Sequence, residues 1–239
     1  MSAATTHGAS GDTSSPLARL PSGSEPLAGV RRHPLVIRVA HWVSVPVLVL
    51  MAGSGLQIFS AYPAFGPRGA SWWYPFAGVP PPTWIRFGGW LAGARHWHFA
   101  LAWVFVANGA LYLAYLAASG EWRRRWFVPK RDGVNAALML AYYLRIRSAP
   151  PTTGFYNGLQ RLAYTSAIGF GALEVVSGLA IYKPVQLWWL VAALGGYEIA
   201  RVVHMSGLLL LAGFTALHVV LVALHPRTLL AMTTRAKHG

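Results

Sequence analysis

The fold of this chain is decided by the stretch from Ile199 to Leu224, which reads IARVVHMSGLLLLAGFTALHVVLVAL. A helix needs ~20 apolar residues to cross the ~30 Å hydrocarbon core of a membrane, and this stretch is long enough to do so. His204 and His218 lie 14 residues apart within it. In a helix that spacing corresponds to ~21 Å of rise and a net rotation of only ~40°. Both imidazole rings therefore point from one face, at opposite membrane depths.

Two other apolar stretches carry a histidine near one end, His41 and His98. Each ring on the last helix thus has a possible partner across a helical bundle. Ionisable side chains inside a bilayer are functional candidates by default. Neutral imidazole is a strong iron ligand, and two axial histidines make a low-spin haem suited to electron transfer. We expect two stacked bis-histidine haems. The alternative is a colourless transporter or assembly factor with hydrogen-bonded core histidines.

Hydrophobic residues make up 55% of the 239-residue chain and charged residues only 11%. This composition is too apolar for a soluble domain of this size. Four segments are long enough to cross a membrane, at about 34–59, 97–118, 158–181 and 199–224. The sequence predicts an all-α, integral membrane four-helix bundle. Its expected parts are a disordered cytoplasmic tail over 1–30, a transmembrane di-haem domain over 31–230 and a second cytoplasmic tail over 231–239.

The net charge of +14 is distributed unevenly along the chain. Fifteen Lys and Arg residues fall in 1–38, 119–161 and 225–239, whereas five fall in 60–95 and 183–201. This is a positive-inside pattern, which predicts four crossings with both termini in the cytoplasm. The basic run that starts at Trp122 is read as a topology and lipid-headgroup signal. No nucleic-acid partner is expected.

This topology decides which histidines can pair. His41 and His218 lie level near the cytoplasmic side, and His98 and His204 lie level near the outer side. His96 competes with His98, which is preferred because it lies deeper in its helix. The chain has no cysteine, which excludes disulfides, iron–sulfur clusters and thioether-bound haem. Histidine is therefore the available ligand for a redox centre.

Other polar residues lie close to these histidines. Haem propionates need cations nearby, and Arg38 and Arg201 each lie one turn before a candidate ligand; ordinary snorkelling arginines are the alternative. Asn157 and Gln160 open the third crossing, where their amides could bind a quinone, with helix capping as the alternative. Glu174 lies near mid-membrane and should be neutral or hydrogen-bonded, with a proton relay as a possible role.

Several segments resemble bacterial cytochrome b561-type membrane subunits. This group includes thiosulfate reductase cytochrome b, the formate dehydrogenase gamma subunit and the nickel–iron hydrogenase b-type cytochrome. The resemblance covers roughly residues 31–230 and rests on Arg38-Val-Ala-His-Trp, Trp97-His98-Phe, Tyr156-Asn-Gly-Leu-Gln-Arg-Leu-Ala-Tyr, Gly178-Leu-Ala-Ile-Tyr-Lys-Pro and Arg201-Val-Val-His. It implies four helices in the inner membrane, two haem b groups, and electron exchange between a membrane quinone and a periplasmic oxidoreductase. It also supports both histidine pairs and places the quinone near Asn157 and His218.

The expected function is therefore that of a membrane di-haem cytochrome b in a respiratory chain. The branch of the family that it resembles most accompanies molybdopterin oxidoreductases of the sulfite oxidase type, and a homo- or hetero-oligomer is possible. The alternative is a stand-alone enzyme that takes electrons from a small reductant such as superoxide. A basic outer surface near Arg86 and Arg95 would favour this alternative, whereas an aromatic surface would favour a docked protein. An amphipathic surface helix over 133–147 and an interfacial segment over 186–194 are also expected.

Overall fold

The computed structural model describes residues 33–151, 156–224, 226, 229 and 232–233. All regular structure in these residues is helical. The predicted tail over 1–30 lies outside the described residues, as does most of the predicted tail over 231–239.

Four long helices carry the apolar segments: α1 (Leu35–Phe59), α2 (Leu91–Ser119), α5 (Gly158–Tyr182) and α7 (Tyr197–Leu224). Each is long and apolar enough to cross a membrane, which confirms the prediction of an all-α bundle with four crossings. The main difference is at α2, which begins six residues before the predicted start. The prediction followed the apolar core only. The helix continues through Arg95 and His96, because polar residues at a membrane edge are free to remain helical.

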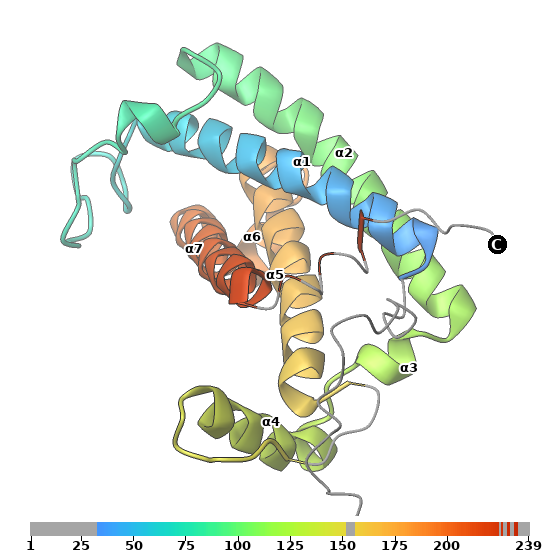
Figure 1. Ribbon diagram of the computed structural model, residues 1–239. Coiled ribbons are helices and arrows are strands. Elements are labelled where there is room, and N and C mark those ends of the chain that lie inside the picture. The colour runs from blue at the N-terminus through green and yellow to red at the C-terminus, as the bar shows by residue number, and fades with distance from the viewer. Residues whose placement is uncertain (1–32, 152–155, 225, 227–228, 230–231, 234–239) are drawn as a thin grey trace, which may run out of the picture.

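The long helices form two hairpins, α1 with α2 and α5 with α7 (Figure 1). Among the described residues, close backbone approaches concentrate within each hairpin, and the two hairpins make few with one another. Fully buried small residues mark the close contacts, namely Ser54, Ala94, Ser177, Ala180 and Ala200. Small side chains let helix backbones approach closely in a membrane protein. The two hairpins therefore face each other mainly through longer side chains, including the candidate histidines.

Short helices cover the ends of the bundle. The predicted amphipathic helix is α4 (Pro129–Tyr143), which lies across the end of α5 in Figure 1. It starts earlier than expected because Pro129 suits the first turn of a helix, and it ends earlier because the backbone of Arg145 is left-handed at φ 59°. α6 (Trp188–Ala193) is too short to cross a membrane. Its exposed Trp188 and Trp189 agree with an interfacial segment. The short helices α3 (Trp122–Arg125) and η1 (Thr83–Ile85) complete the fold.

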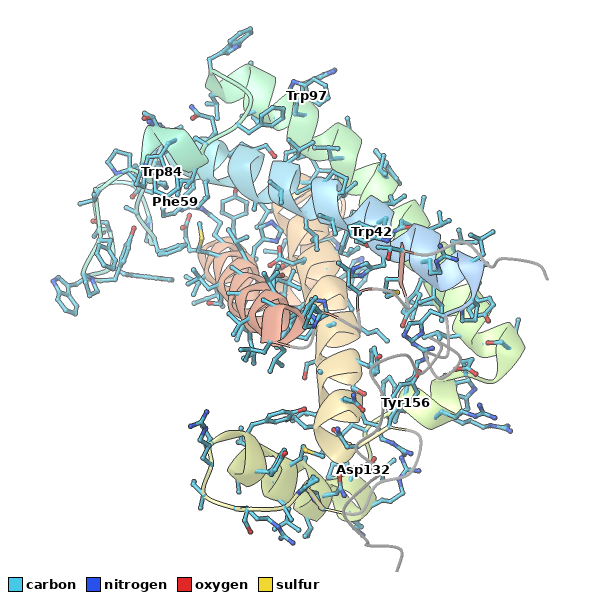
Figure 2. All side chains as sticks on the ribbon, in the orientation of Figure 1. Trp42, Phe59, Trp84, Trp97, Asp132 and Tyr156 are labelled. Carbon is cyan, nitrogen blue, oxygen red and sulfur yellow. The ribbon has the colours of Figure 1, made fainter. Side chains whose placement is uncertain are left out.

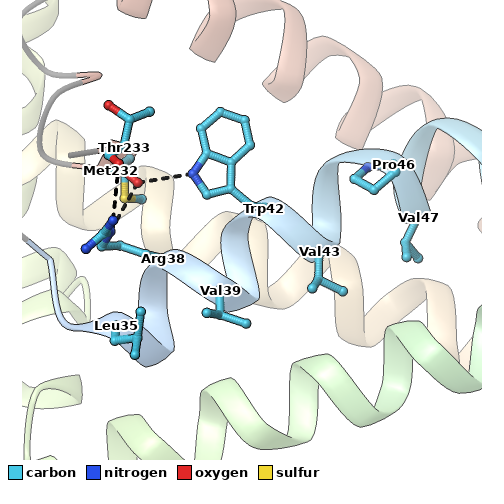
Figure 3. A pocket seen from close by; sticks show the side chains of 9 residues that line it. All are labelled: Leu35, Arg38, Val39, Trp42, Val43, Pro46, Val47, Met232 and Thr233. Atoms are coloured by element: carbon cyan, nitrogen blue, oxygen red, sulfur yellow. Dashed lines mark hydrogen bonds between the residues drawn. The ribbon is translucent and has the colours of Figure 1, made fainter. Parts of the chain in front are cut away.

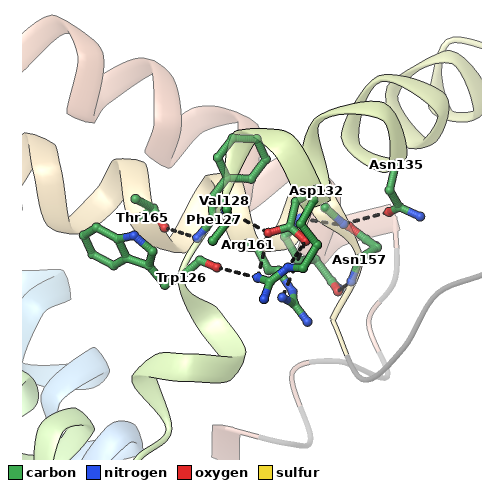
Figure 4. A network of polar contacts seen from close by, with 11 residues as sticks. Trp126, Phe127, Val128, Asp132, Asn135, Asn157, Arg161 and Thr165 are labelled. Atoms are coloured by element: carbon green, nitrogen blue, oxygen red, sulfur yellow. Dashed lines mark hydrogen bonds and ion pairs between the residues drawn. The ribbon is translucent and has the colours of Figure 1, made fainter.

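A polar network fixes the junction of α4 and α5 (Figure 4). The buried carboxylate of Asp132 accepts hydrogen bonds from Val128 N and from the Arg131 guanidinium, each at 2.9 Å. Arg161 of α5 lies 3.5 Å from the same carboxylate. Asn135 accepts a hydrogen bond from Gly158 N at 2.8 Å. Gly158 allows this contact, since a Cβ there would collide with the backbone of α4.

The molecule has two distinct ends. Figure 2 shows Trp84 and Trp97 at one end and Asp132 and Tyr156 at the other. We call the first the loop end, because it carries residues 60–90 and α6, and the second the α4 end.

Candidate functional site: two histidine pairs between hairpins

The four candidate histidines meet in two pairs, each of which joins one hairpin to the other. The rings of His98 on α2 and His204 on α7 have centroids 6.2 Å apart. The rings of His41 on α1 and His218 on α7 have centroids 6.1 Å apart. We call these the outer pair and the inner pair. His96 is exposed, so the structure places His98 and not His96 opposite His204.

The outer pair is oriented by hydrogen bonds within each hairpin. Nδ1 of His98 lies 3.2 Å from the carbonyl oxygen of Met51 and 3.0 Å from Ser54 Oγ. Because a carbonyl oxygen only accepts, Nδ1 must carry the proton. The Nε2 lone pair of the neutral ring then remains available for a metal. Metal-ligating histidines are usually held in this way, with the other ring nitrogen donating to a fixed acceptor.

His204 has the same arrangement on the other hairpin. Its Nδ1 lies 3.0 Å from Ser177 Oγ and 2.9 Å from Glu174 Oε2. The Ser177 hydroxyl donates to the carbonyl of Leu173 at 2.6 Å, so it accepts from His204. Nε2 is again the free nitrogen. Glu174, expected to be neutral or hydrogen-bonded, is therefore a partner of His204, and Gly207 leaves the space that its carboxyl group occupies.

Glycines make room for the two outer rings. A Cβ at Gly55 would lie 3.3 Å from Cε1 of His98, and a Cβ at Gly178 would lie 3.2 Å from Cε1 of His204. Both distances are shorter than an ordinary carbon–carbon contact of ~3.5–4.0 Å. Each ring therefore packs against a serine–glycine step of the neighbouring helix, where the serine holds Nδ1 and the glycine admits the ring edge.

These matched contacts follow from an internal correspondence in the sequence. Residues 38–59 of α1 align with 161–182 of α5, and residues 95–112 of α2 align with 201–218 of α7, each without a gap. The first alignment matches Ser54-Gly-Leu-Gln-Ile-Phe with Ser177-Gly-Leu-Ala-Ile-Tyr, and the second matches His98 with His204. At the inner level the correspondence breaks. His41 aligns with Tyr164, and His218 aligns with Tyr112.

The inner pair is more open than the outer pair. His41 is half-buried and His218 is exposed. The ring of Phe214 lies nearly parallel to that of His218, with an angle of 9° between the planes. Trp42 packs edge-on against His41. Aromatic rings therefore flank this pair, and His218 is accessible from outside the bundle.

The arrangement fits a haem iron at each pair. Bonds between a metal ion and an imidazole nitrogen are ~2 Å long, so two rings that ligate one ion from opposite sides have centroids ~6 Å apart. Both pairs have this separation. No group of three or more His, Asp or Glu side chains able to hold a metal comes together in the part of the chain that the structure describes. An iron held by one of these histidine pairs would therefore need its remaining ligands from a macrocycle.

Arg38 lies on α1 beside a groove of about 570 Å³ that apolar residues of the same helix line (Figure 3). Its Nε donates to the carbonyl of Met232 at 3.2 Å and its Nη2 donates to the carbonyl of Thr233 at 3.3 Å. Trp42 donates to the same Met232 carbonyl at 3.1 Å. The structure therefore uses Arg38 to hold residues near the C-terminus against α1.

Arg201 is likewise engaged with protein groups. It forms an ion pair with Glu198 at 2.7 Å and donates to the carbonyl of Ala64 at 2.9 Å. Its guanidinium also lies over the rings of Tyr62 and Phe65. These contacts tie the loop that follows α1 to the start of α7. Arg201 therefore joins the two hairpins at the loop end.

Asn157 and Gln160 form a reciprocal cap at the start of α5. Asn157 Oδ1 accepts from Gln160 N at 2.8 Å, and Gln160 Oε1 accepts from Asn157 N at 3.1 Å. This capping box satisfies backbone donors that have no partner inside the helix. Both side-chain oxygens are thus committed to the cap, and only the amide NH₂ groups remain for another ligand.

Sequence reasoning missed Ser54 and Ser177, and it read Arg125 only as part of a basic run. The repeated Ser-Gly-Leu-x-Ile segment was a usable signal for the serines. Arg125 carried no such signal, because Arg123 and Arg124 beside it are exposed whereas Arg125 is 3% exposed.

The fold and the site define a class of protein: a helical integral membrane protein with histidine pairs suited to haem. The chain belongs to the prokaryotic cytochrome b561 family, whose model matches residues 32–235. It is therefore a multi-pass membrane haem b protein of electron transport. One relative is the "Putative protein-methionine-sulfoxide reductase subunit YedZ1" of Azospira oryzae, which is 40% identical over 200 residues, covering 84% of this chain and 94% of the relative. No solved structure matches the chain significantly.

Proposed function

We propose that the chain is a di-haem subunit that carries electrons across the membrane, between a partner oxidoreductase and a membrane quinone. The observation that supports this most is the placement of two histidine pairs at two depths, both between the hairpins and each with the same ring separation. The bound haems would supply one-electron redox chemistry. The chain itself would contribute the ligands His41, His98, His204 and His218.

The distribution of basic residues supports an orientation for the chain. The α4 end carries the basic segments 119–147 and Arg161. By the positive-inside rule this end faces the cytoplasm, so the loop end faces the periplasm of a bacterial inner membrane. The outer pair then lies near the periplasmic side and the inner pair near the cytoplasmic side.

The loop end is suited to a protein partner. Several large aromatic side chains of this loop are exposed, including Trp73 (87%), Trp84 (82%) and Trp90 (72%). Aromatic residues are enriched at protein interfaces as well as at membrane surfaces. The name of the YedZ1 relative describes a subunit of a protein-methionine-sulfoxide reductase. A partner of that kind would use two electrons and two protons to convert each sulfoxide to a thioether and water.

A membrane quinol would then donate electrons at the α4 end, releasing two electrons and two protons as it becomes the quinone. We place its head group near His218 and the start of α5, where the amide NH₂ groups of Asn157 and Gln160 remain for its carbonyl oxygens. A small-reductant enzyme would instead take electrons at the loop end, where Arg95 is exposed. The exposed indoles of the loop favour the docked protein over a small anionic reductant.

The test is a haem count followed by a reduction assay on the detergent-purified chain. A pyridine haemochrome assay should give two protohaems per chain, with a low-spin spectrum. A short-chain quinol should reduce both haems, and superoxide should reduce them no faster in the wild type than in an Arg95→Gln variant. A colourless chain would refute the proposal, and rapid superoxide-dependent reduction that Arg95→Gln abolishes would favour the stand-alone enzyme.

A further inference from the structure

Arg125 is a buried cation at the α4 end of the bundle. It is 3% exposed, whereas the side chain of Arg124, the preceding residue of the same short helix, is 61% exposed. A guanidinium is costly to bury unless its charge is balanced and its N–H groups are hydrogen-bonded. The partners of Arg125 therefore indicate what this residue is for.

The protein groups around Arg125 balance its charge only in part. Its Nη2 lies 3.3 Å from Glu121 Oε2, and Glu121 also pairs with Arg124. The guanidinium carbon lies 5.2 Å and 5.4 Å from the ring centres of Tyr164 and Tyr156. Tyr112 also lies close to the Arg125 guanidinium. Its Nε is buried and has no acceptor among the described residues, so one donor remains for an oxygen ligand.

The internal correspondence places this cluster at the depth of the inner histidine pair. Tyr112 and Tyr164, which contact Arg125, align with His218 and His41. The packing places the cluster beside this level, because Asn108 of α2 donates to the carbonyl of Ala40, next to His41, at 2.9 Å. Tyr112 lies one turn beyond Asn108, toward the α4 end. The cluster occupies the α2–α5 side of the inner level, and the histidines occupy the α1–α7 side.

The electrostatic field of Arg125 also reaches the start of α1. The pKa of His33, which lies just before α1, is lowered by burial and then by the charge of Arg125. The other arginines considered for propionates have protein partners: Arg38 binds backbone carbonyls of residues 232 and 233, and Arg201 binds Glu198. Arg161 at the start of α5 also has a buried Nε without an acceptor among the described residues, but its guanidinium pairs with Asp132 at the junction with α4. Arg125 is the more deeply buried of these two cations, with its side chain 4% exposed against 18% for Arg161.

We infer that Arg125 binds a propionate carboxylate of the haem held by His41 and His218. This inference rests on the proposed function. A guanidinium suits a carboxylate because its planar N–H groups match the two oxygens. The carboxylate would satisfy Nε and complete the charge balance that Glu121 begins. A fixed positive charge close to the macrocycle would also favour the reduced iron, whose charge is lower by one. A lipid phosphate is the other oxyanion with suitable chemistry.

The decisive variant is Arg125→Gln, with Arg124→Gln as its matched control, since both remove one positive charge from the same helix. Redox titration with spectral detection would measure each haem. The inner haem is identified as the one that the His218→Ala variant lacks. We expect Arg125→Gln to lower the reduction potential of this haem and the amount of it bound per chain. Arg124→Gln should leave both haems unchanged. Unchanged potentials and a full haem content in Arg125→Gln would overturn the inference.

Thermal stability separates the haem from the other possible roles. The wild type and Arg125→Gln would be melted both haem-loaded and haem-depleted, in neutral lipid and in phosphatidylglycerol. A propionate contact predicts a loss of Tm in the haem-loaded protein only. An equal loss in both forms would assign Arg125 to helix packing, and a loss confined to phosphatidylglycerol would assign it to a lipid phosphate; either result overturns the inference. A wild type without haem would instead refute the proposed function.

Discussion

Gly178 of α5 offers a sharp test of how the α5–α7 hairpin holds the ring of His204. Gly178→Ala would place a Cβ 3.2 Å from Cε1 and 3.7 Å from Nδ1 of His204. The ring must then move by a few tenths of an ångström. Such a movement strains the hydrogen bonds from Nδ1 to Ser177 and Glu174, which are 3.0 Å and 2.9 Å long. The same ring carries the proposed iron ligand.

The expected magnitude is set by comparison with Gly213→Ala on α7. A Cβ added at Gly213 would have nothing within 4 Å, and this residue lies ~180° around the helix from His204. Alanine in place of a helical glycine stabilises by roughly 0.5–1 kcal/mol, and Gly213→Ala should show that gain. At Gly178 the same gain is opposed by overpacking, which costs about 1–3 kcal/mol. The two variants should therefore differ by about 1–3 kcal/mol in the free energy of unfolding.

The assay is thermal unfolding followed by circular dichroism, together with a redox titration of both haems. Gly178→Ala should melt below Gly213→Ala, and the potential of the outer haem should shift while that of the inner haem stays constant. If Gly178→Ala stabilises the protein as much as Gly213→Ala and leaves both potentials unchanged, then the glycine does not position the ring and the reasoning fails.

Three further predictions test other parts of the structure. His98→Ala should remove one protohaem per chain by pyridine haemochrome and His96→Ala none; the reverse result would reassign the outer ligand. Gly158→Ala should lower the free energy of unfolding by about 1–3 kcal/mol, toward the upper end of that range, because the added Cβ would meet the backbone of α4. Gly133→Ala has open space around the added Cβ and should not lower the free energy of unfolding. The Arg131 guanidinium chiefly holds the pKa of Asp132 at about 2, below its usual 3.8. The carboxylate therefore contributes stability above pH 3.8 that is lost as the pH falls through about 2. Asp132→Asn should flatten this acidic part of the profile of Tm against pH. An unchanged profile would show that the ion pair contributes little to stability.

The helices and the histidine pairs were accessible from the sequence because both depend on local spacing. An apolar run of 26 residues from Ile199 is long enough to cross a membrane, and the spacing of His204 and His218 follows from helix geometry alone. The structure brings together the rings that were expected to meet. Whether they ligate iron stays a prediction, as does the assignment of the quinone site.

The partners of the polar side chains were not accessible in the same way. Arg38 and Arg201 bind carbonyls of segments that are distant in sequence, and helical spacing carries no information on such contacts. Arg125 is buried although its neighbours are exposed, because the short helix α3 turns it toward Tyr112 and Tyr164. That turn depends on how α2 ends and α5 packs, which is a property of the whole fold.

The scarcity of backbone contact between the two hairpins has a consequence for biogenesis. Each hairpin can enter the membrane and form by itself, since its packing and the hydrogen bonds of its outer histidine are internal. Joining the halves then depends on side chains that reach across, among them the histidines, the Arg201 contacts with the loop, the Arg125 cluster, and the rings of Phe99 and Tyr182. If haem bridges the histidine pairs, its supply limits the last step of assembly. Cells short of haem would accumulate inserted but separable halves, which membrane proteases can recognise.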